Sequence, residues 1–297
     1  TFSIMNKRTH TQGGKLNEQD FAQILKSMFS GKYVTDSRKI GQTISKIWYE
    51  FVYPEDESPY IKGELYKWRR LDYPDSLDNF IAEELPDFVQ KYINYLDDRI
   101  EKNTAAISDA ESESAAERIA NNQKHYASLK SALMKAKNRL GQVAFITNII
   151  RRSAQLYLGR GFERTLDISE NHIGVYNGVL QLHPLKLIQS FHEIPISRSC
   201  GSNFKPYNPD DPYIAELEKN IKLLICNDVG EFDEDTYTYI MMFLASSLDG
   251  RKKQPIFFLW LGEGGNGKSF LLEMHIQTMA TVIGNGYGNK INVSFFT

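Results

Sequence analysis

The chain has 297 residues, with 35 Lys and Arg against 37 Asp and Glu, and 41% of its residues are hydrophobic. This composition excludes disordered and collagen-like proteins, and the length suits two domains or one large domain. Two cysteines, Cys200 and Cys226, are too few for a disulfide framework or a cysteine-ligated zinc site, which indicates a reducing compartment.

The apolar runs and the N-terminus indicate whether the chain crosses a membrane and whether it is part of a longer protein. The longest apolar run, 255–261, is far shorter than the roughly 20 residues that span a bilayer, so we expect no membrane partner. The chain opens at Thr1 without an initiator Met or the apolar core of a signal peptide. We therefore expect it to be a piece of a longer protein.

The first predicted elements are a helix and a hairpin. Asn17 followed by acidic residues is typical of a helix N-terminus, and apolar residues then recur at helical spacing up to Phe29, which predicts a helix of about three turns. Two aromatic-rich segments, 46–53 and 64–71, flank a stretch with Pro and Gly. We expect these segments to pair as a hairpin with a long loop.

The charge of the next region is strongly asymmetric. Residues 71–117 hold 13 acidic and 3 basic side chains, whereas residues 118–164 hold 10 basic ones and a single acidic one. The acidic window fits a helix that is kinked or restarted at Pro86, and 104–117 is either a link or an extension of this helix. In the basic window, apolar residues spaced three and four apart from Tyr126 to Tyr157 predict one long helix with a narrow apolar seam.

We infer a helical hairpin over about 75–158 with an acidic arm and a basic arm. Two interpretations of its charge stay open. The arms can neutralise each other when they pack antiparallel. Alternatively, the basic face can follow the phosphates of a nucleic acid. The candidate DNA contacts are Lys135, Lys137, Arg139, Arg151 and Arg152.

After Gly161 the segments become short. The run 172–182 contains an Asn177-Gly178 turn signal and predicts a small β element, followed by a loop over 196–212. Asp210 or Asp211 can cap a helix that begins at Pro212, and a further helix is expected over 236–248.

The strongest local signal is Gly262-Glu263-Gly264-Gly265-Asn266-Gly267-Lys268-Ser269, which fits the P-loop pattern. An apolar run at 255–261 has the length of a buried parallel strand, and residues after Ser269 continue as a helix. Strand, glycine loop and helix are the setting in which such a loop binds the phosphates of a nucleotide.

The loop's residue types fit that chemistry. Glycines let backbone N–H groups turn toward the phosphates, Lys268 places a positive charge on the β and γ phosphates, and the Ser269 hydroxyl can ligate Mg²⁺. ATP and Mg²⁺ are therefore the expected cofactors. The predicted nucleotide-binding residues are Gly262, Gly264, Gly265, Asn266, Gly267, Lys268 and Ser269, with Lys268 catalytic and Ser269 the metal ligand.

The motif alone does not complete an active site. Turnover also needs a carboxylate at a strand end that holds Mg²⁺ and positions water. The 28 residues after Ser269 contain only Glu273, which lies within the predicted helix. We therefore expect this chain by itself to be inactive, because it contains no Walker B carboxylate.

The P-loop with Asn266 before Gly267-Lys268-Ser269 resembles that of superfamily 3 helicases. The stretch from Leu166-Asp167 to Asn177-Gly178-Val179, the aromatic pair Trp48-Tyr49 with Trp68, and Leu248-Asp249-Gly250 resemble in order the region around the P-loop of primase-helicases from nucleocytoplasmic large DNA viruses, of the poxvirus and African swine fever virus type. The resemblance covers most of residues 40–275.

This resemblance implies a mixed α and β fold: a largely helical collar-type domain over 1–208 with a small β element, and over 209–297 the first strand, P-loop and helix of an AAA+-like NTPase domain. It implies an ATP-driven replicative DNA helicase that works as a homohexamer on single-stranded DNA, with a primase module in the same parent chain, at the viral replication site in the host cytoplasm. The alternative is an oligomerisation or DNA-binding module in which the truncated P-loop is inactive. A nucleotide kinase fits less well, because roughly 255 residues precede the strand.

Overall fold

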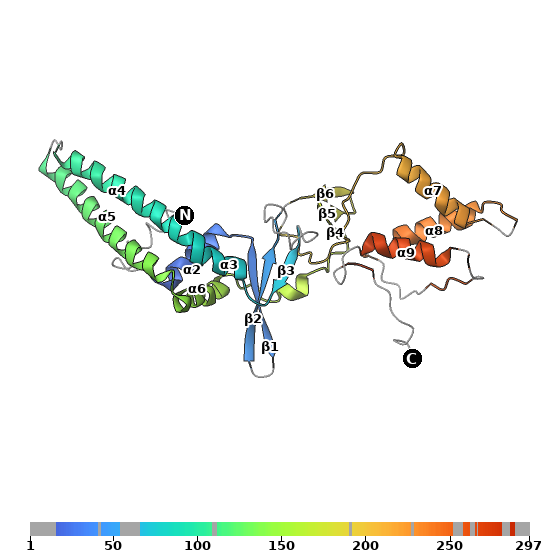
Figure 1. Cartoon of the computed structure of the whole chain (residues 1–297), viewed down its shortest axis with the longest axis horizontal. Coiled ribbons are helices and arrows are strands. Elements are labelled where there is room, and N and C mark those ends of the chain that lie inside the picture. Colours follow the sequence, from blue (N-terminus) through green and yellow to red (C-terminus); the bar gives the residue numbers. More distant parts are fainter. Residues whose placement is uncertain are drawn as a thin grey trace. The chain divides into compact units, whose positions relative to one another are not determined.

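The computed structural model describes residues 16–40, 43–53, 66–108, 112–189, 192–226, 229–251, 258–261, 265, 267–280 and 286–288. The fold is mixed α and β, as expected, and the described residues form two three-stranded sheets (Figure 1). The chain forms two compact units. The first comprises Thr1–Glu50 with Arg70–Phe162, and the second comprises Phe51–Arg69 with Glu163–Thr297. The predicted boundary between residues 208 and 209 stays a prediction.

The predicted first helix is confirmed as α2 (Glu18–Met28). The Asn17 side chain accepts hydrogen bonds from the amides of Gln19 and Asp20, while the Asp20 carboxylate accepts one from the Asn17 amide. This reciprocal capping box satisfies backbone donors that have no partner within the helix. The helix therefore begins where the sequence predicts.

The first sheet has the strand order β1 (Tyr33–Ile40), β2 (Thr43–Phe51), β3 (Trp68–Leu71). The two aromatic segments do become neighbouring strands, which confirms their predicted pairing. The sequence pattern does not predict β1, which pairs antiparallel with β2 from Tyr33 opposite Glu50 to Ile40 opposite Thr43. Polar residues such as Thr35, Asp36 and Ser37 obscure its strand pattern, although Thr35 and Asp36 are buried.

The acidic arm is formed by α3 (Asp75–Asn79), a π-helical turn over Phe80–Glu84, and α4 (Leu85–Ser108). Within the turn, the amide of Leu85 donates to the carbonyl of Phe80, five residues back. Pro86 follows at once and has no N–H to donate, so the regular helical pattern cannot continue unchanged through this point. The expected disturbance at Pro86 is thus a π turn, and α4 extends into the stretch 104–117.

The predicted single helix through the basic arm is wrong. It is divided into α5 (Glu113–Arg139) and α6 (Val143–Leu156), with a break at Gly141 and Gln142. Glycine weakens a helix, and the extended Gln142 starts the next one. The seam also shifts, because Val143 is 79% exposed and the buried face of α6 starts at Phe145.

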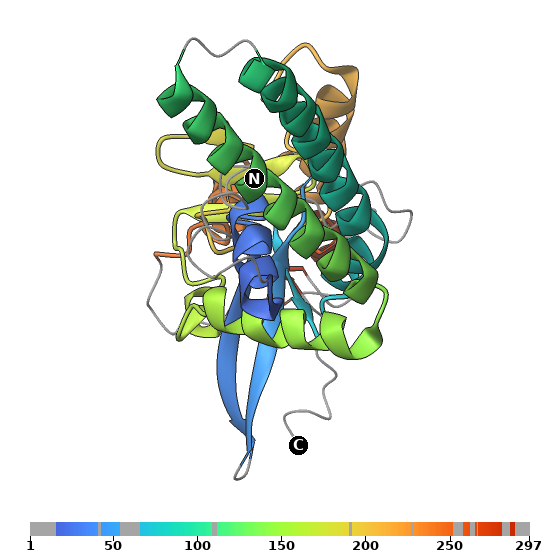
Figure 2. The ribbon, with the colours of Figure 1, turned by 90° about the vertical axis from the view of Figure 1, so that its left-hand side faces the viewer.

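The hairpin of two antiparallel arms is confirmed, because α4 packs along α5 (Figures 1 and 2). Meanwhile α6 packs on α2. One buried cluster joins these helices to the sheet, and Phe21 and Phe145 meet edge to face within it. The core of the first unit therefore lies where α2, α6 and the base of the helical hairpin converge on β1 and β2. Its largest buried members include Tyr33, Trp48, Leu85, Tyr92, Leu133 and Tyr157.

The second unit contains the predicted β element. A short 3-10 turn, η2 (Phe162–Thr165), begins in the first unit and leads to β4 (His172–Val175), β5 (Gly178–Gln181) and β6 (Lys186–Ile188), which pair in that order. Val175 pairs with Gly178, so the connecting residues are Tyr176 and Asn177, one position before the predicted turn pair. The loop prediction for 196–212 holds over 196–211, where no strand or helix is assigned, and Pro212 already belongs to the next helix.

Three further helices follow in the part of the chain that the structure describes. They are α7 (Pro212–Leu224), α8 (Glu234–Ser246) and α9 (Lys268–Met279). Asp211 caps α7 and Pro212 is its first residue, as predicted. The apolar segment before the glycine loop differs from expectation, since the described residues 258–261 form no strand. A parallel strand needs neighbours to pair its backbone groups, and no described strand lies beside this segment. No helix in the described part of the chain is long and apolar enough to cross a membrane.

Candidate nucleotide site and basic surface

The glycine loop leads directly into α9. Gly265 and Gly267 have φ angles of +87° and +77°, and Gly267 is the N-cap residue of the helix. This left-handed conformation is readily available only to glycine. Lys268 is the first residue of α9 and is half-buried, and Ser269 is exposed next to it. The predicted residues Gly262, Gly264 and Asn266 lie outside the described residues.

The start of α9 is supported by a small apolar cluster. Ile221 and Ile225 of α7 and Leu271 of α9 are buried together, with Trp260 and Met274 packed against them. Gly267 lies against α7 so closely that an added Cβ would sit 2.5 Å from Cδ2 of Leu224. The φ angle thus favours glycine at position 267, and an added Cβ would also require the Leu224 side chain to shift. The amides of the first turn of α9 form a helix N-terminus, which favours an anion.

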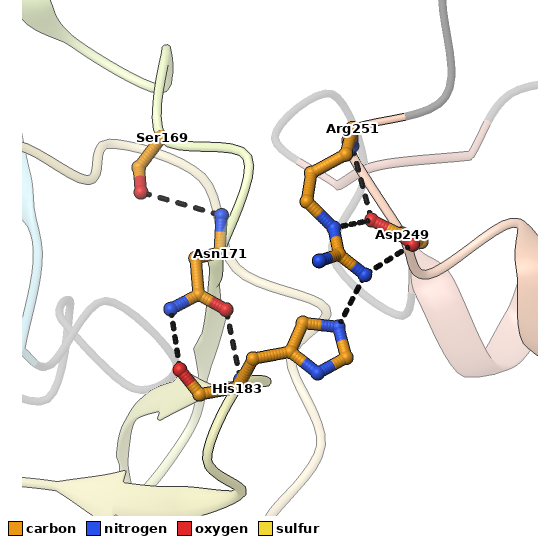
Figure 3. A network of polar contacts seen from close by, with 5 residues as sticks. All are labelled: Ser169, Asn171, His183, Asp249 and Arg251. Atoms are coloured by element: carbon orange, nitrogen blue, oxygen red, sulfur yellow. Dashed lines mark hydrogen bonds and ion pairs between the residues drawn. The ribbon is translucent and has the colours of Figure 1, made fainter.

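The segment that precedes the glycine loop is tied to the β element (Figure 3). The Arg251 guanidinium donates from Nε and Nη2 to the two carboxylate oxygens of Asp249, each at 2.9 Å. Nη2 also donates to Nε2 of His183, which lies after β5. These hydrogen bonds to Arg251 lower the pKa of Asp249 to about 2. Asn171 in turn holds the backbone of His183 through its side-chain amide.

The stretch that carries the family resemblance has a structural role here. The Asp167 carboxylate accepts hydrogen bonds from the amides of Ser197 and Arg198 and from the Ser197 hydroxyl. The Asn177 side chain both accepts from the amide of Phe204 and donates to its carbonyl. An added Cβ at Gly174 would lie 2.0 Å from the carbonyl oxygen of Arg198. These residues therefore hold the segment 197–204 against β4, a role that spacing alone did not reveal.

A cavity of about 290 Å³ lies in the second unit between the β4 region and the end of α9. Its wall contains two serine–histidine pairs: Ser169 Oγ lies 2.6 Å from Nδ1 of His172, and Ser247 Oγ lies 2.8 Å from Nε2 of His275. Burial lowers the pKa of both histidines. Both are therefore neutral near pH 7 and pair with hydroxyl groups.

These histidines predict a pH-dependent stability of the second unit. Because their pKa is lower in the folded state, their contribution is fully present above about pH 6.5, the unfolded value, and is lost as the pH falls through the folded pKa. We expect hydrogen-exchange protection in β4 and α9 to fall from pH 6.5 to pH 5. The double variant His172→Gln/His275→Gln should flatten this dependence. His125→Gln in α5 is the control, and an unchanged slope in the double variant would contradict the assignment.

The five predicted DNA contacts lie on two different helices, α5 and α6. On α5, Lys135 is exposed, Lys137 donates to Oε1 of Gln90, and Arg139 pairs with Glu18 at 2.9 Å. An ion pair also joins the arms, between Lys130 and Asp97. Pairing between the arms is thus present in part. The other two residues, Arg151 and Arg152, are exposed on α6.

The described residues include no group of three or more His, Cys, Asp or Glu side chains that could hold a metal ion. Ser269 is therefore the one candidate metal ligand among the described residues. Its exposed position beside Lys268 leaves the hydroxyl accessible to a Mg²⁺ ion carried by a nucleotide.

Comparison with known proteins found no matching family model. The whole chain is 30% identical over 302 residues to "Putative primase C962R" of African swine fever virus, in isolates from Malawi and Namibia among others. It is 25% identical over 268 residues, 90% of its length, to "Putative helicase L207/L206" of Acanthamoeba polyphaga mimivirus. The chain spans only 28% of the length of the first protein and 24% of the second.

Proposed function

We propose that this chain is part of a replicative DNA helicase driven by ATP. The chain belongs to the primase-helicase family of the nucleocytoplasmic large DNA viruses. A role related to replication primases and helicases follows from the family. The finer assignment, coupling of ATP hydrolysis to movement along single-stranded DNA and to duplex unwinding, is the proposal.

The observation that carries the proposal is the start of α9. A left-handed glycine at the N-cap, followed at once by Lys268 and Ser269, is the arrangement in which a helix N-terminus binds phosphate. Gly265, Gly267 and the first amides of α9 would hold the phosphates, Lys268 would neutralise their charge, and Ser269 would ligate Mg²⁺. Bound Mg²⁺-ATP would supply the phosphoryl group that is transferred to water.

We place this chain in a collar and the first part of a superfamily 3, AAA+-like motor, in a homohexamer at the viral replication site in the host cytoplasm. A primase module in the same parent is consistent with the small share of the relative that the chain spans. The carboxylate that positions water would come from residues beyond Thr297.

The test is steady-state ATP hydrolysis by a parent chain that extends beyond Thr297, with and without single-stranded DNA. We expect turnover to rise severalfold with DNA, because movement along a strand couples binding to hydrolysis. Heparin at equal charge is the control for a general effect of polyanions. Turnover that ignores DNA, or rises equally with heparin, would overturn the helicase assignment.

A further inference from the structure

Three segments of the first unit carry basic residues and no acidic ones. They are the adjoining ends of β1 and β2 (37–40 and 43–47), α6, and the segment 157–161 that follows α6. Charge counts over consecutive residues do not reveal this clustering of basic segments, because the first segment lies about 100 residues before the others. Together they contain Arg38, Lys39, Lys46, Arg151, Arg152 and Arg160.

The tertiary structure brings these segments together. The Thr35 hydroxyl donates to the carbonyl of Ala154 in the last turn of α6, at 2.6 Å. The Thr35 backbone bonds to Tyr157 and Gly159 on the following segment, at 2.9 and 2.8 Å. The end of α6 and residues 157–161 therefore lie along β1, immediately before the part of the hairpin that extends beyond the helices of this unit (Figures 1 and 2).

Four of the arginines face solvent, whereas Lys46 is half-buried and donates to Oγ of Ser37 at 2.7 Å. Arg38, Arg151, Arg152 and Arg160 are exposed. The carboxylate of this stretch, that of Asp36, is buried and accepts hydrogen bonds from the amides of Ser37 and Gly161. This differs from the α5 arm, where several cations are held by side chains of neighbouring helices.

The shape and composition of this surface favour one class of partner. A two-stranded β-ribbon fits the major groove of a DNA duplex, which is about 12 Å wide. Basic residues on the ribbon and at its base can then contact the phosphates on either side of the groove. Single-stranded DNA is usually held by stacking of its bases on exposed aromatic rings. The aromatic residues of the three segments, Phe145 and Tyr157, are both buried.

We propose that the β1–β2 hairpin and the adjoining end of α6 form a binding surface for duplex DNA, with the hairpin in the major groove. This surface is distinct from the α9 nucleotide site and does not need ATP. It also differs from the basic face of α5. Arg151 and Arg152 belong to this surface together with Arg38, Lys46 and Arg160. In a helicase, such a surface would hold the duplex, whereas the motor would act on the single strand.

The experiment measures binding of the full chain to a labelled 20-base-pair duplex by fluorescence anisotropy, without nucleotide, over a series of salt concentrations. We expect affinity to fall steeply with salt. The variant Arg38→Gln/Lys46→Gln should bind roughly tenfold more weakly and should lower the salt slope by about two. Arg151→Gln/Arg152→Gln should act in the same direction.

The matched control is Arg118→Gln/Lys124→Gln, which removes two exposed charges from α5. It should bind like the unchanged chain. An equal loss in this control, tighter binding of a 20-nucleotide single strand, or displacement of the duplex by polyglutamate at equal charge would each overturn the proposal. Because no nucleotide is present, this outcome is independent of whether the parent hydrolyses ATP.

Discussion

Replacing Lys268 by alanine in a parent chain that extends beyond Thr297 is expected to lower ATP turnover by about 100-fold or more. Lys268 is the first residue of α9, directly after the left-handed Gly267. At this position its ammonium would lie beside the β and γ phosphates, where charge accumulates during phosphoryl transfer. Alanine retains the helix start but removes this charge. The measurement is steady-state hydrolysis at saturating single-stranded DNA.

The matched control for this prediction is Lys205→Ala, which makes the same change at an exposed position of the loop before α7. It should leave turnover within about twofold, since surface substitutions away from such sites have small effects. Circular dichroism should show the same helix content in both variants. A Lys268→Ala parent that retains more than half of the turnover would contradict the assignment of the nucleotide site.

The second large effect is expected from Asp167→Ala, which should destabilise the second unit by about 2–4 kcal/mol. The carboxylate is the common acceptor for the Ser197 amide and hydroxyl and for the Arg198 amide, and its loss leaves these donors without their partner. Asp167 also has a φ angle of +58°, which aspartate tolerates better than alanine. Hydrogen exchange at the amides of Ser197 and Arg198 reports the loss directly.

Asp167→Asn separates the two contributions. Asparagine tolerates the left-handed conformation and retains one acceptor oxygen, so we expect less than half of the alanine effect. Because the chain has two units, stability should be followed by exchange within each unit, and the amides of α2 and α5 should be unaffected. An alanine variant with unchanged protection at Ser197 would contradict the structural role of Asp167.

Sequence alone was sufficient where the information is local. Asn17 with Asp20, and Asp211 with Pro212, predict helix starts because a cap bonds to amides within the next three residues. The glycine loop predicts the start of α9 for the same reason: Gly267 determines its own backbone conformation, and Lys268 follows it. The opposite charges of residues 71–117 and 118–164 likewise indicated the helical hairpin, because its two arms are adjacent in the chain. The family resemblance rested on such short segments as well, and the comparisons confirm it.

Tertiary structure determined the features that depend on distant partners. The apolar seam continues smoothly through Gly141 in the sequence, yet the chain breaks there because packing on α2 buries Phe145 and exposes Val143. The polar strand β1 is stable because its backbone pairs with β2 and with the segment after α6. Asp167 accepts hydrogen bonds from an amide 30 residues away. The strand that carries Arg38 meets the helix that carries Arg151 through the hydrogen bond from Thr35 to Ala154. Such contacts have no periodic signature in the sequence, because the residues that form them meet only after the chain has folded.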